Sequence, residues 1–179
     1  MAGSERELQL LREARSLVSD EGVQALTMRR LGRRSQIAAA GIYHYFRSRD
    51  DLVDHLHDVV FAEYEHVLGP APTDPSAEAV ASWLSNGQSW LAANGELVAL
   101  TAECGLRHQM AHLPAHFVQV LVGGTEPNPS EAAAAVKPDL VGDAAILLMR
   151  TAALPSGSVD LPRMVKNFRS HVQAIASVS

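Results

Sequence analysis

The sequence LTMRRLGRRSQIAAAGIYHYFRSRDDL occupies residues 26–52 and contains two short helical segments separated by a few residues. Thr27 is placed to cap a helix that continues to about Ser35, because a threonine oxygen accepts a hydrogen bond from the first helical turn. A second helix is expected from about Ala38 to Phe46. Two short helices joined by three or four residues, after a longer amphipathic helix, predict a helix-turn-helix motif.

The second of these helices is suited to a DNA groove. A helix that enters the major groove, about 12 Å wide, needs small or hydrogen-bonding residues on its outer face. Small residues fill its N-terminal end at 38–41, which is the end that approaches base edges. Ile42 and Phe46, four residues apart, are expected to pack inward. Tyr43 and His44 supply hydrogen-bond donors near the end where phosphates lie.

Arginine is concentrated in the same region. Six arginines and no acidic residue lie between Gly22 and Arg49. Residues 1–57 hold nine arginines against eight acids, whereas residues 58–179 hold six basic residues against twelve acids. A basic N-terminal part followed by an acidic remainder of the chain is typical of a protein that binds a polyanion. A solvated arginine-rich face is the alternative that charge alone leaves open.

Like-charged arginines are spaced four residues apart in the first short helix, as Arg29 with Arg33 and Arg30 with Arg34. Such pairs destabilise an isolated helix by a few tenths of a kcal/mol. A phosphate backbone opposite them would offset this cost. The alternative is that the arginines pair with acids of the preceding helix; the candidates are Glu13, Asp20 and Glu21.

The spacing of apolar residues is helical along nearly the whole chain and predicts an all-α protein of about nine helices. The proline-rich segment 69–75 and the segment 123–129 are expected breaks. The helices are expected at about residues 4–21, 27–35, 38–46, 48–68, 76–94, 96–112, 114–123, 139–153 and from 160 onward.

Several function classes are not favoured. A single cysteine, Cys104, cannot form an intrachain disulfide, and no apolar run reaches the roughly 18 residues of a membrane span. The N-terminal residues lack the apolar core of a secretory signal, so a cytoplasmic protein is expected. Nucleophile elbow, P-loop and dinucleotide-binding motifs do not occur. We therefore expect no enzyme, no catalytic residue and no cofactor.

Two histidine groups imitate metal sites. The run DHLHD at 54–58 has the wrong spacing, since helical residues two apart point about 200° from each other. His108 and His112 are four apart, but Gln109 stands where a zinc protease needs glutamate, and Pro114 breaks the phase before His116. Solvated or hydrogen-bonded histidines are the preferred interpretation, and no metal site is predicted.

Residues 8–57 resemble the N-terminal domain of the TetR family of bacterial transcriptional regulators. The resemblance is carried by LTMRRL at 26–31, by YHYF at 43–46 and by RSRDDL at 47–52. It implies a three-helix helix-turn-helix DNA-binding domain at 1–49, here called the head. A helical ligand-binding and dimerisation domain at 50–179, here called the body, follows from the same resemblance.

The resemblance also assigns roles. Thr27 caps the second helix and touches phosphate, and Arg29 reaches a base edge or a phosphate. Three small residues face the bases, and the remaining residues contact the DNA backbone. The expected DNA-binding residues are Thr27, Arg29, Arg30, Ala39, Ala40, Gly41, Tyr43, His44 and Arg49.

The turn departs from the family pattern. Gln36 replaces the usual glycine, and Ala38 replaces the serine that usually caps the reading helix, a loss of about 1 kcal/mol. Gly32 replaces the usual alanine inside the second helix, at a further cost of up to about 1 kcal/mol. These changes predict that the DNA-reading helix-turn-helix is less stable than is usual in the family.

The resemblance implies a homodimer that pairs through the last two helices, about 139–153 and from 160. It also implies a pocket for a small-molecule inducer among the body helices, although tryptophans at helical spacing are more often plain core. Glu103 and Arg107, four residues apart, are alternatively a surface ion pair. The candidate ligand residues are Phe61, Trp83, Trp90, Glu103, Arg107, Phe117 and Met149.

The function that these features predict is a ligand-responsive regulator, a repressor, that binds a palindromic operator as a dimer and leaves it when an inducer binds. The alternative is a relative of the family whose reading helix has degenerated and which acts as a protein-interaction module.

Overall fold

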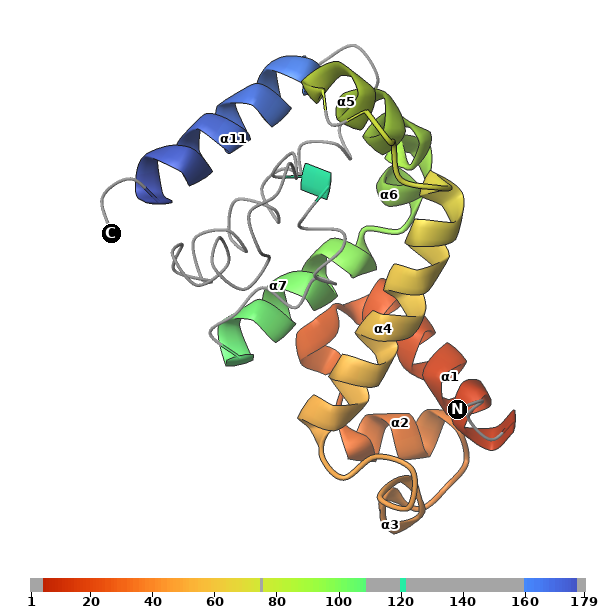
Figure 1. Ribbon diagram of the computed structural model, residues 1–179. Coiled ribbons are helices and arrows are strands. Elements are labelled where there is room, and N and C mark those ends of the chain that lie inside the picture. The colour runs from red at the N-terminus through yellow and green to blue at the C-terminus, as the bar shows by residue number, and fades with distance from the viewer. Residues whose placement is uncertain (1–4, 75, 109–119, 122–159, 177–179) are drawn as a thin grey trace.

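The computed structural model describes residues 5–74, 76–108, 120–121 and 160–176. All regular structure in these ranges is helical (Figure 1). The elements are α1 (Glu5–Glu21), the 3₁₀ turn η1 (Val23–Ala25), α2 (Met28–Arg34), α3 (Ala39–Ile42), α4 (Arg49–Leu68), α5 (Ala77–Asn86), α6 (Gln88–Ala93), α7 (Glu96–His108) and α11 (Leu161–Ala176).

The all-α class predicted from the apolar spacing is confirmed for these residues. The helices predicted at 114–123 and 139–153 fall largely outside the described residues, as does the break at 123–129.

The head is built by α1, α2 and α3 around a core of buried apolar residues. Helix α1 packs on α2 and α4 through its buried apolar residues. Ile42 and Phe46 are fully buried, as their spacing predicted. The chain leaves the head through α4, which runs from the head to α5 and α6 (Figure 1). The buried residues of the head are Leu10, Leu11, Ala14, Leu17, Val18, Leu26, Met28, Leu31, Ile42 and Phe46.

The predicted helix boundaries follow the capping residues. Gly22 ends α1 with a φ of 84°, and Gly69 ends α4 with a φ of 72°, a region that glycine enters without a steric penalty. Ser48 caps α4 by accepting a hydrogen bond from the Asp51 amide over 3.1 Å. The Asp51 carboxylate in turn accepts from the Arg47 amide over 2.7 Å. These helix ends are therefore stabilised by contacts between residues at most four apart in sequence.

Two predicted helices are wrong in extent. The reading helix predicted over 38–46 is helical only at Ala39–Ile42, because the Tyr45 amide then bonds to the Ile42 carbonyl over 2.9 Å and tightens the chain into a turn. The helix predicted over 76–94 is divided at Gly87 into α5 and α6. A Cβ at Gly87 would overlap the ring of Tyr64, so α4 leaves no room for a side chain at the division.

The body surrounds α4. One side of α4 packs on α7, and its C-terminal half packs on α5 and α6. Helix α11 lies along α5 and buries Leu161, Val165 and Phe168 (Figure 1). Within the described residues no helix is both long and apolar enough to cross a membrane.

Candidate nucleic-acid interface

Helices α2 and α3 are held at a fixed distance by a glycine. The Ile37 amide donates to the Gly32 carbonyl over 2.8 Å, and a Cβ at Gly32 would lie 2.6 Å from the Ile37 carbonyl oxygen. Real Cβ contacts are not that short, so only glycine permits this approach. The sequence-based interpretation of Gly32 as a helix-weakening residue was therefore incomplete, because the glycine is what lets the turn close.

The turn itself is strained where the sequence departs from the family pattern. Gln36 has a φ of 56°, the one non-glycine residue with positive φ in the described part of the chain. This left-handed conformation costs an L-residue with a Cβ roughly 1–2 kcal/mol. Thr27 caps α2 as predicted, accepting from the Arg30 amide over 3.2 Å, whereas Ala38 offers α3 no side-chain cap.

The outer face of the helix-turn-helix carries small, uncharged residues at its tip, where α3 lies. Helix α3 lies at the end of the molecule farthest from α11 (Figure 1). Ala40 is exposed, Ala39 and Gly41 are half-buried, and Tyr43 exposes 54 % of its surface. His44 is exposed beside Tyr43.

The arginines around this tip divide into two groups. Arg30 pairs with Glu21 at 2.9 Å, and Arg34 reaches both Asp20 at 2.9 Å and Glu13 at 3.3 Å. Arg30 and Arg34 therefore pair with acids of α1, which was the alternative to phosphate contact in the sequence analysis. The bond to Asp20, and then that to Glu13, raises the pKa of the Arg34 guanidinium.

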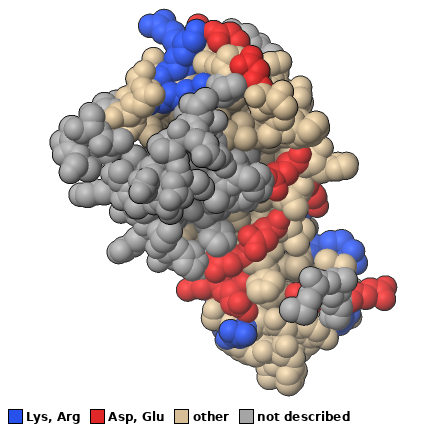
Figure 2. All heavy atoms as spheres, viewed as in Figure 1, with Lys and Arg blue, Asp and Glu red and all other residues tan. Residues whose placement is uncertain are grey.

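The second group points to solvent. Arg29, Arg33 and Arg47 are exposed, and their guanidinium groups make no hydrogen bond or ion pair with any described residue. In Figure 2 the tip where α3 lies is drawn without charged residues, and blue Lys or Arg spheres lie above it together with red Asp or Glu spheres. An uncharged tip with exposed arginines nearby suits a groove that two phosphate backbones border.

Arg49 points away from this surface. Its guanidinium donates to the carbonyls of Leu26 at 2.9 Å and Val23 at 3.1 Å, and to the Glu103 carboxylate at 2.8 Å. The sequence placed Arg49 at a phosphate, but in this structure its donors are engaged inside the protein. We therefore do not count Arg49 with the exposed arginines Arg29, Arg33 and Arg47.

A second arginine also joins the head to the body. Arg15 of α1 donates to Glu63 of α4 at 2.6 Å and to Glu96 of α7 at 2.9 Å, and its guanidinium lies over the Trp90 ring at 5.9 Å. Glu96 and Glu103 are seven residues apart and thus lie on one face of α7, two turns apart. Sequence reasoning missed this pattern, although the spacing of the two acids was visible.

The interface of α4 with α7 carries two more polar contacts. Thr101 gives its hydroxyl proton to the Leu97 carbonyl at 2.8 Å, so it accepts a hydrogen bond from His57 Nε2 at 3.1 Å. Cys104 donates to Asp54 at 3.4 Å. His57 is buried whereas His55 is exposed and bonds to the Asp51 carbonyl, so the two histidines of the DHLHD run occupy different faces of α4.

The candidate ligand residues that the structure describes lie in three different surroundings. Phe61 and Trp90 each contact Tyr64, with ring centroids 6.1 Å and 5.6 Å apart. Trp83 is buried elsewhere, where its indole donates to the Gly69 carbonyl over 3.1 Å. Glu103 lies at the junction with the head instead of a pocket. The Arg107 side chain, Phe117 and Met149 lie outside the described part of the structure.

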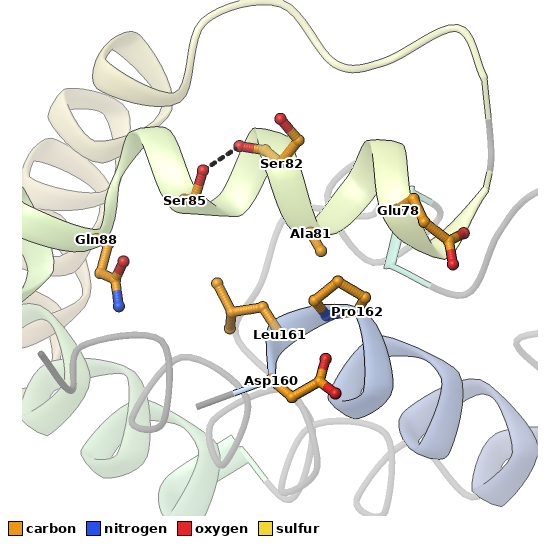
Figure 3. Close-up of a pocket in the computed structure, with 8 residues that line it drawn as sticks. All are labelled: Glu78, Ala81, Ser82, Ser85, Gln88, Asp160, Leu161 and Pro162. Atoms are coloured by element: carbon orange, nitrogen blue, oxygen red, sulfur yellow. Dashed lines mark hydrogen bonds between the residues drawn. The ribbon is translucent and has the colours of Figure 1, made fainter. Parts of the chain in front are cut away.

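A groove of about 330 Å³ opens between α5 and the start of α11 (Figure 3). Its polar groups are already engaged: Glu78 pairs with Lys166, Asp160 accepts from the Arg163 amide, and Ser85 donates to the Ser82 carbonyl. None of the candidate ligand residues lines it. Its lining residues are Glu78, Ala81, Ser82, Ser85, Gln88, Asp160, Leu161 and Pro162.

Comparison with known proteins agrees with the helix-turn-helix. The family model described as bacterial regulatory proteins, tetR family, matches residues 10–56. This range includes most of α1, the whole of α2 and α3 and the first part of α4. No curated protein sequence matches the chain.

Solved structures share the fold over the whole chain. A TetR-like transcriptional regulator from Rhodococcus sp. RHA1 is 20 % identical, with a TM-score of 0.50 and full coverage of both chains. A TetR variant from Acinetobacter baumannii AYE, solved with minocycline, is 14 % identical with a TM-score of 0.55, covering 99 % of this chain and 96 % of its own.

The fatty acid degradation regulator FadR from Bacillus halodurans is 13 % identical, with a TM-score of 0.54 and 96 % coverage of both chains. At these identities the structural matches speak for the fold alone. Residues 10–56, which hold the helix-turn-helix, therefore match the N-terminal domain of the TetR family of bacterial regulatory proteins.

Proposed function

We propose that the chain represses transcription by binding a palindromic operator as a homodimer, and that a small-molecule inducer releases it. The observation that carries this proposal is the head surface, which combines an uncharged reading helix with three exposed arginines that make no ion pair with a described residue, Arg29, Arg33 and Arg47. The reading helix fits the major groove, and Arg29, Arg33 and Arg47 are placed for phosphates. A protein with this partner acts in the cytoplasm of a bacterial cell.

Dimerisation follows from the way such heads read DNA. Two heads reach successive major grooves only if a two-fold axis holds them about 34–36 Å apart. We assign the pairing to the last two helices, of which α11 is described. The apolar stripe of α11 is partly used against α5, through Leu161, Val165 and Phe168, while Met164 and Val172 stay half-buried. A second copy is the partner proposed for the remaining face.

Release by an inducer requires that the body bias the orientation of the head. An inducer that binds one body conformation better than another shifts the population between them. Helix α4 belongs to both domains, and α7 contacts the head through the pairs of Glu96 with Arg15 and Glu103 with Arg49. We propose that displacement of α4 and α7 is what turns the two heads out of register with the grooves.

The test is selection of bound sequences from a pool of random DNA duplexes by the full chain, followed by titration of the selected duplex at two salt concentrations. We expect saturable binding whose affinity falls steeply with salt, because bound phosphates release counterions. Tyr43→Ala should abolish selection of a common sequence. Arg33→Ala should weaken binding and reduce the salt slope by about one contact.

The matched control is Arg12→Ala, which removes an exposed arginine from α1, outside the two short helices and outside the proposed dimer interface. Its affinity for the selected duplex should equal that of the unaltered chain, and sedimentation of both proteins should give a dimer. Weak binding without any selected sequence would contradict the proposal. The strained Gln36 and the uncapped α3 would then favour the alternative, a head that contacts a protein.

A further inference from the structure

The face of the reading helix that points away from the protein carries methyl groups where a hydrogen-bonding side chain is usual for base readout. Ile42 is fully buried and thereby fixes the rotation of α3. Residues two apart on a helix point about 200° from each other, so Ala40 lies opposite Ile42. Ala40 and the preceding Ala38 are both exposed.

No charged residue occurs between Ser35 and Phe46. The polar side chains at this tip are Gln36, which lies in the turn before the helix, and Tyr43 with His44, which lie beyond its C-terminal end. Arg30 and Arg34 are held by acids of α1. The centre of the tip is therefore apolar, and donors lie only at its margins.

The four base pairs differ in what they offer such a face. In the major groove, guanine, adenine and cytosine present acceptors or amino donors, and the 5-methyl group of thymine is the one apolar feature. An alanine methyl placed over an amino or carbonyl group would desolvate it without replacing its hydrogen bond, which costs binding energy. Placed over a thymine methyl, it removes two apolar surfaces from water.

We propose that Ala40 recognises the 5-methyl group of thymine, so that each half-site carries a thymine under this face of α3. The inference rests on the proposed function, since it assigns the base that the head of the regulator reads. The same methyl group is present on 5-methylcytosine. Recognition of the methyl group can therefore be tested apart from recognition of the thymine–adenine pair.

The experiment uses the duplex selected by the full chain, with each thymine of one half-site replaced in turn by deoxyuridine, which lacks the methyl group. We expect one replacement to weaken binding about fourfold, the effect of burying one methyl-sized group. The Ala40→Gly protein should bind the thymine and deoxyuridine duplexes equally. Ala40→Ser, which keeps the helix more readily than glycine, should also lose the distinction.

The readout is the ratio of affinities for the two duplexes within each protein, so a general loss of helix stability cancels. Ala92→Gly, an exposed alanine of α6, is the control and should keep the fourfold ratio. In two further duplexes, cytosine replaces the thymine at this position, either unmethylated or as 5-methylcytosine. The 5-methylcytosine duplex should recover part of the affinity that the duplex with unmethylated cytosine loses.

Two results would overturn the inference separately from the proposed function. If a sequence is selected but no deoxyuridine replacement changes its affinity, the head reads DNA by shape or by its arginines, and the methyl readout is wrong while the regulator stands. The same holds if Ala40→Gly keeps the fourfold ratio. If no sequence is selected, the proposed function fails and the inference fails with it.

Discussion

Arg49 Nη1 and Glu103 Oε1 lie 2.8 Å apart and join the first turn of α4 to α7. The same guanidinium also donates to the Val23 and Leu26 carbonyls, so one side chain ties the connection between α1 and α2 to the body. Glu103 exposes 13 % of its side chain and also accepts from Gln24 at 2.8 Å. The orientation of the head therefore depends on α7 as well as on α4.

Replacing Glu103 by glutamine should lower the free energy of unfolding by about 1–2 kcal/mol, because a partly buried, charged hydrogen bond becomes neutral. Urea denaturation followed by circular dichroism measures this. The control is Glu5→Gln, an exposed acid of α1 without an ion pair to a described residue, which should change stability by less than about 0.5 kcal/mol.

Adding Arg49→Gln to Glu103→Gln should cost less than the sum of the two single changes, since both remove the same ion pair. Strictly additive losses would show that the two side chains do not interact in solution.

Gly32→Ala should destabilise the head by about 1–3 kcal/mol, because the new Cβ would lie 2.6 Å from the Ile37 carbonyl oxygen and force α2 and α3 apart. Thermal denaturation of both proteins gives the difference. Gly95→Ala is the control, since a Cβ there meets no atom within 4 Å. A Gly32→Ala protein as stable as the Gly95→Ala protein would refute this account of the turn.

Gln36→Gly should raise the free energy of unfolding by about 0.5–1 kcal/mol, because glycine adopts the φ of 56° without strain but loses more entropy on folding. Gln36→Ala keeps the Cβ and should bring no gain. The two variants are compared by chemical denaturation. Equal stability of the two would mean that the positive φ is not a source of strain.

Stability should depend on pH through Glu78. The hydrogen bond from Lys166 lowers the pKa of Glu78 below its usual 4.5. A carboxylate with a lowered folded-state pKa contributes stability above the ordinary value, and this contribution is lost as the pH falls through the folded value.

The melting temperature of the unaltered chain should therefore exceed that of Glu78→Gln at neutral pH, and the difference should shrink as the pH falls below the usual Glu78 pKa of 4.5. Because both side chains are exposed, added salt should reduce the difference as well. A difference that persists in acid would mean that Glu78 acts through packing and not through its charge.

Much of the head was determined by the sequence, because its signals are local. Thr27, Ser48 and Gly22 place helix ends through contacts within a few residues of themselves, and the spacing of Ile42 and Phe46 identifies the inward face of the motif. The motifs within residues 26–52 also predicted the family through their resemblance to its N-terminal domain. The assignment of individual residues to DNA and to a ligand stays a prediction.

Tertiary structure alone decided how the arginines are used and where the helices are interrupted. Arg49 and Glu103 are 54 residues apart in sequence, so no local pattern pairs them, and the pairing exists only because α4 packs on α7. In the same way, Tyr64 of α4 occupies the space that a side chain at Gly87 would need, at the residue where α5 ends and α6 begins. Helix caps act over one turn and are encoded locally, whereas ion pairs and close approaches between helices depend on the packed arrangement of the whole chain.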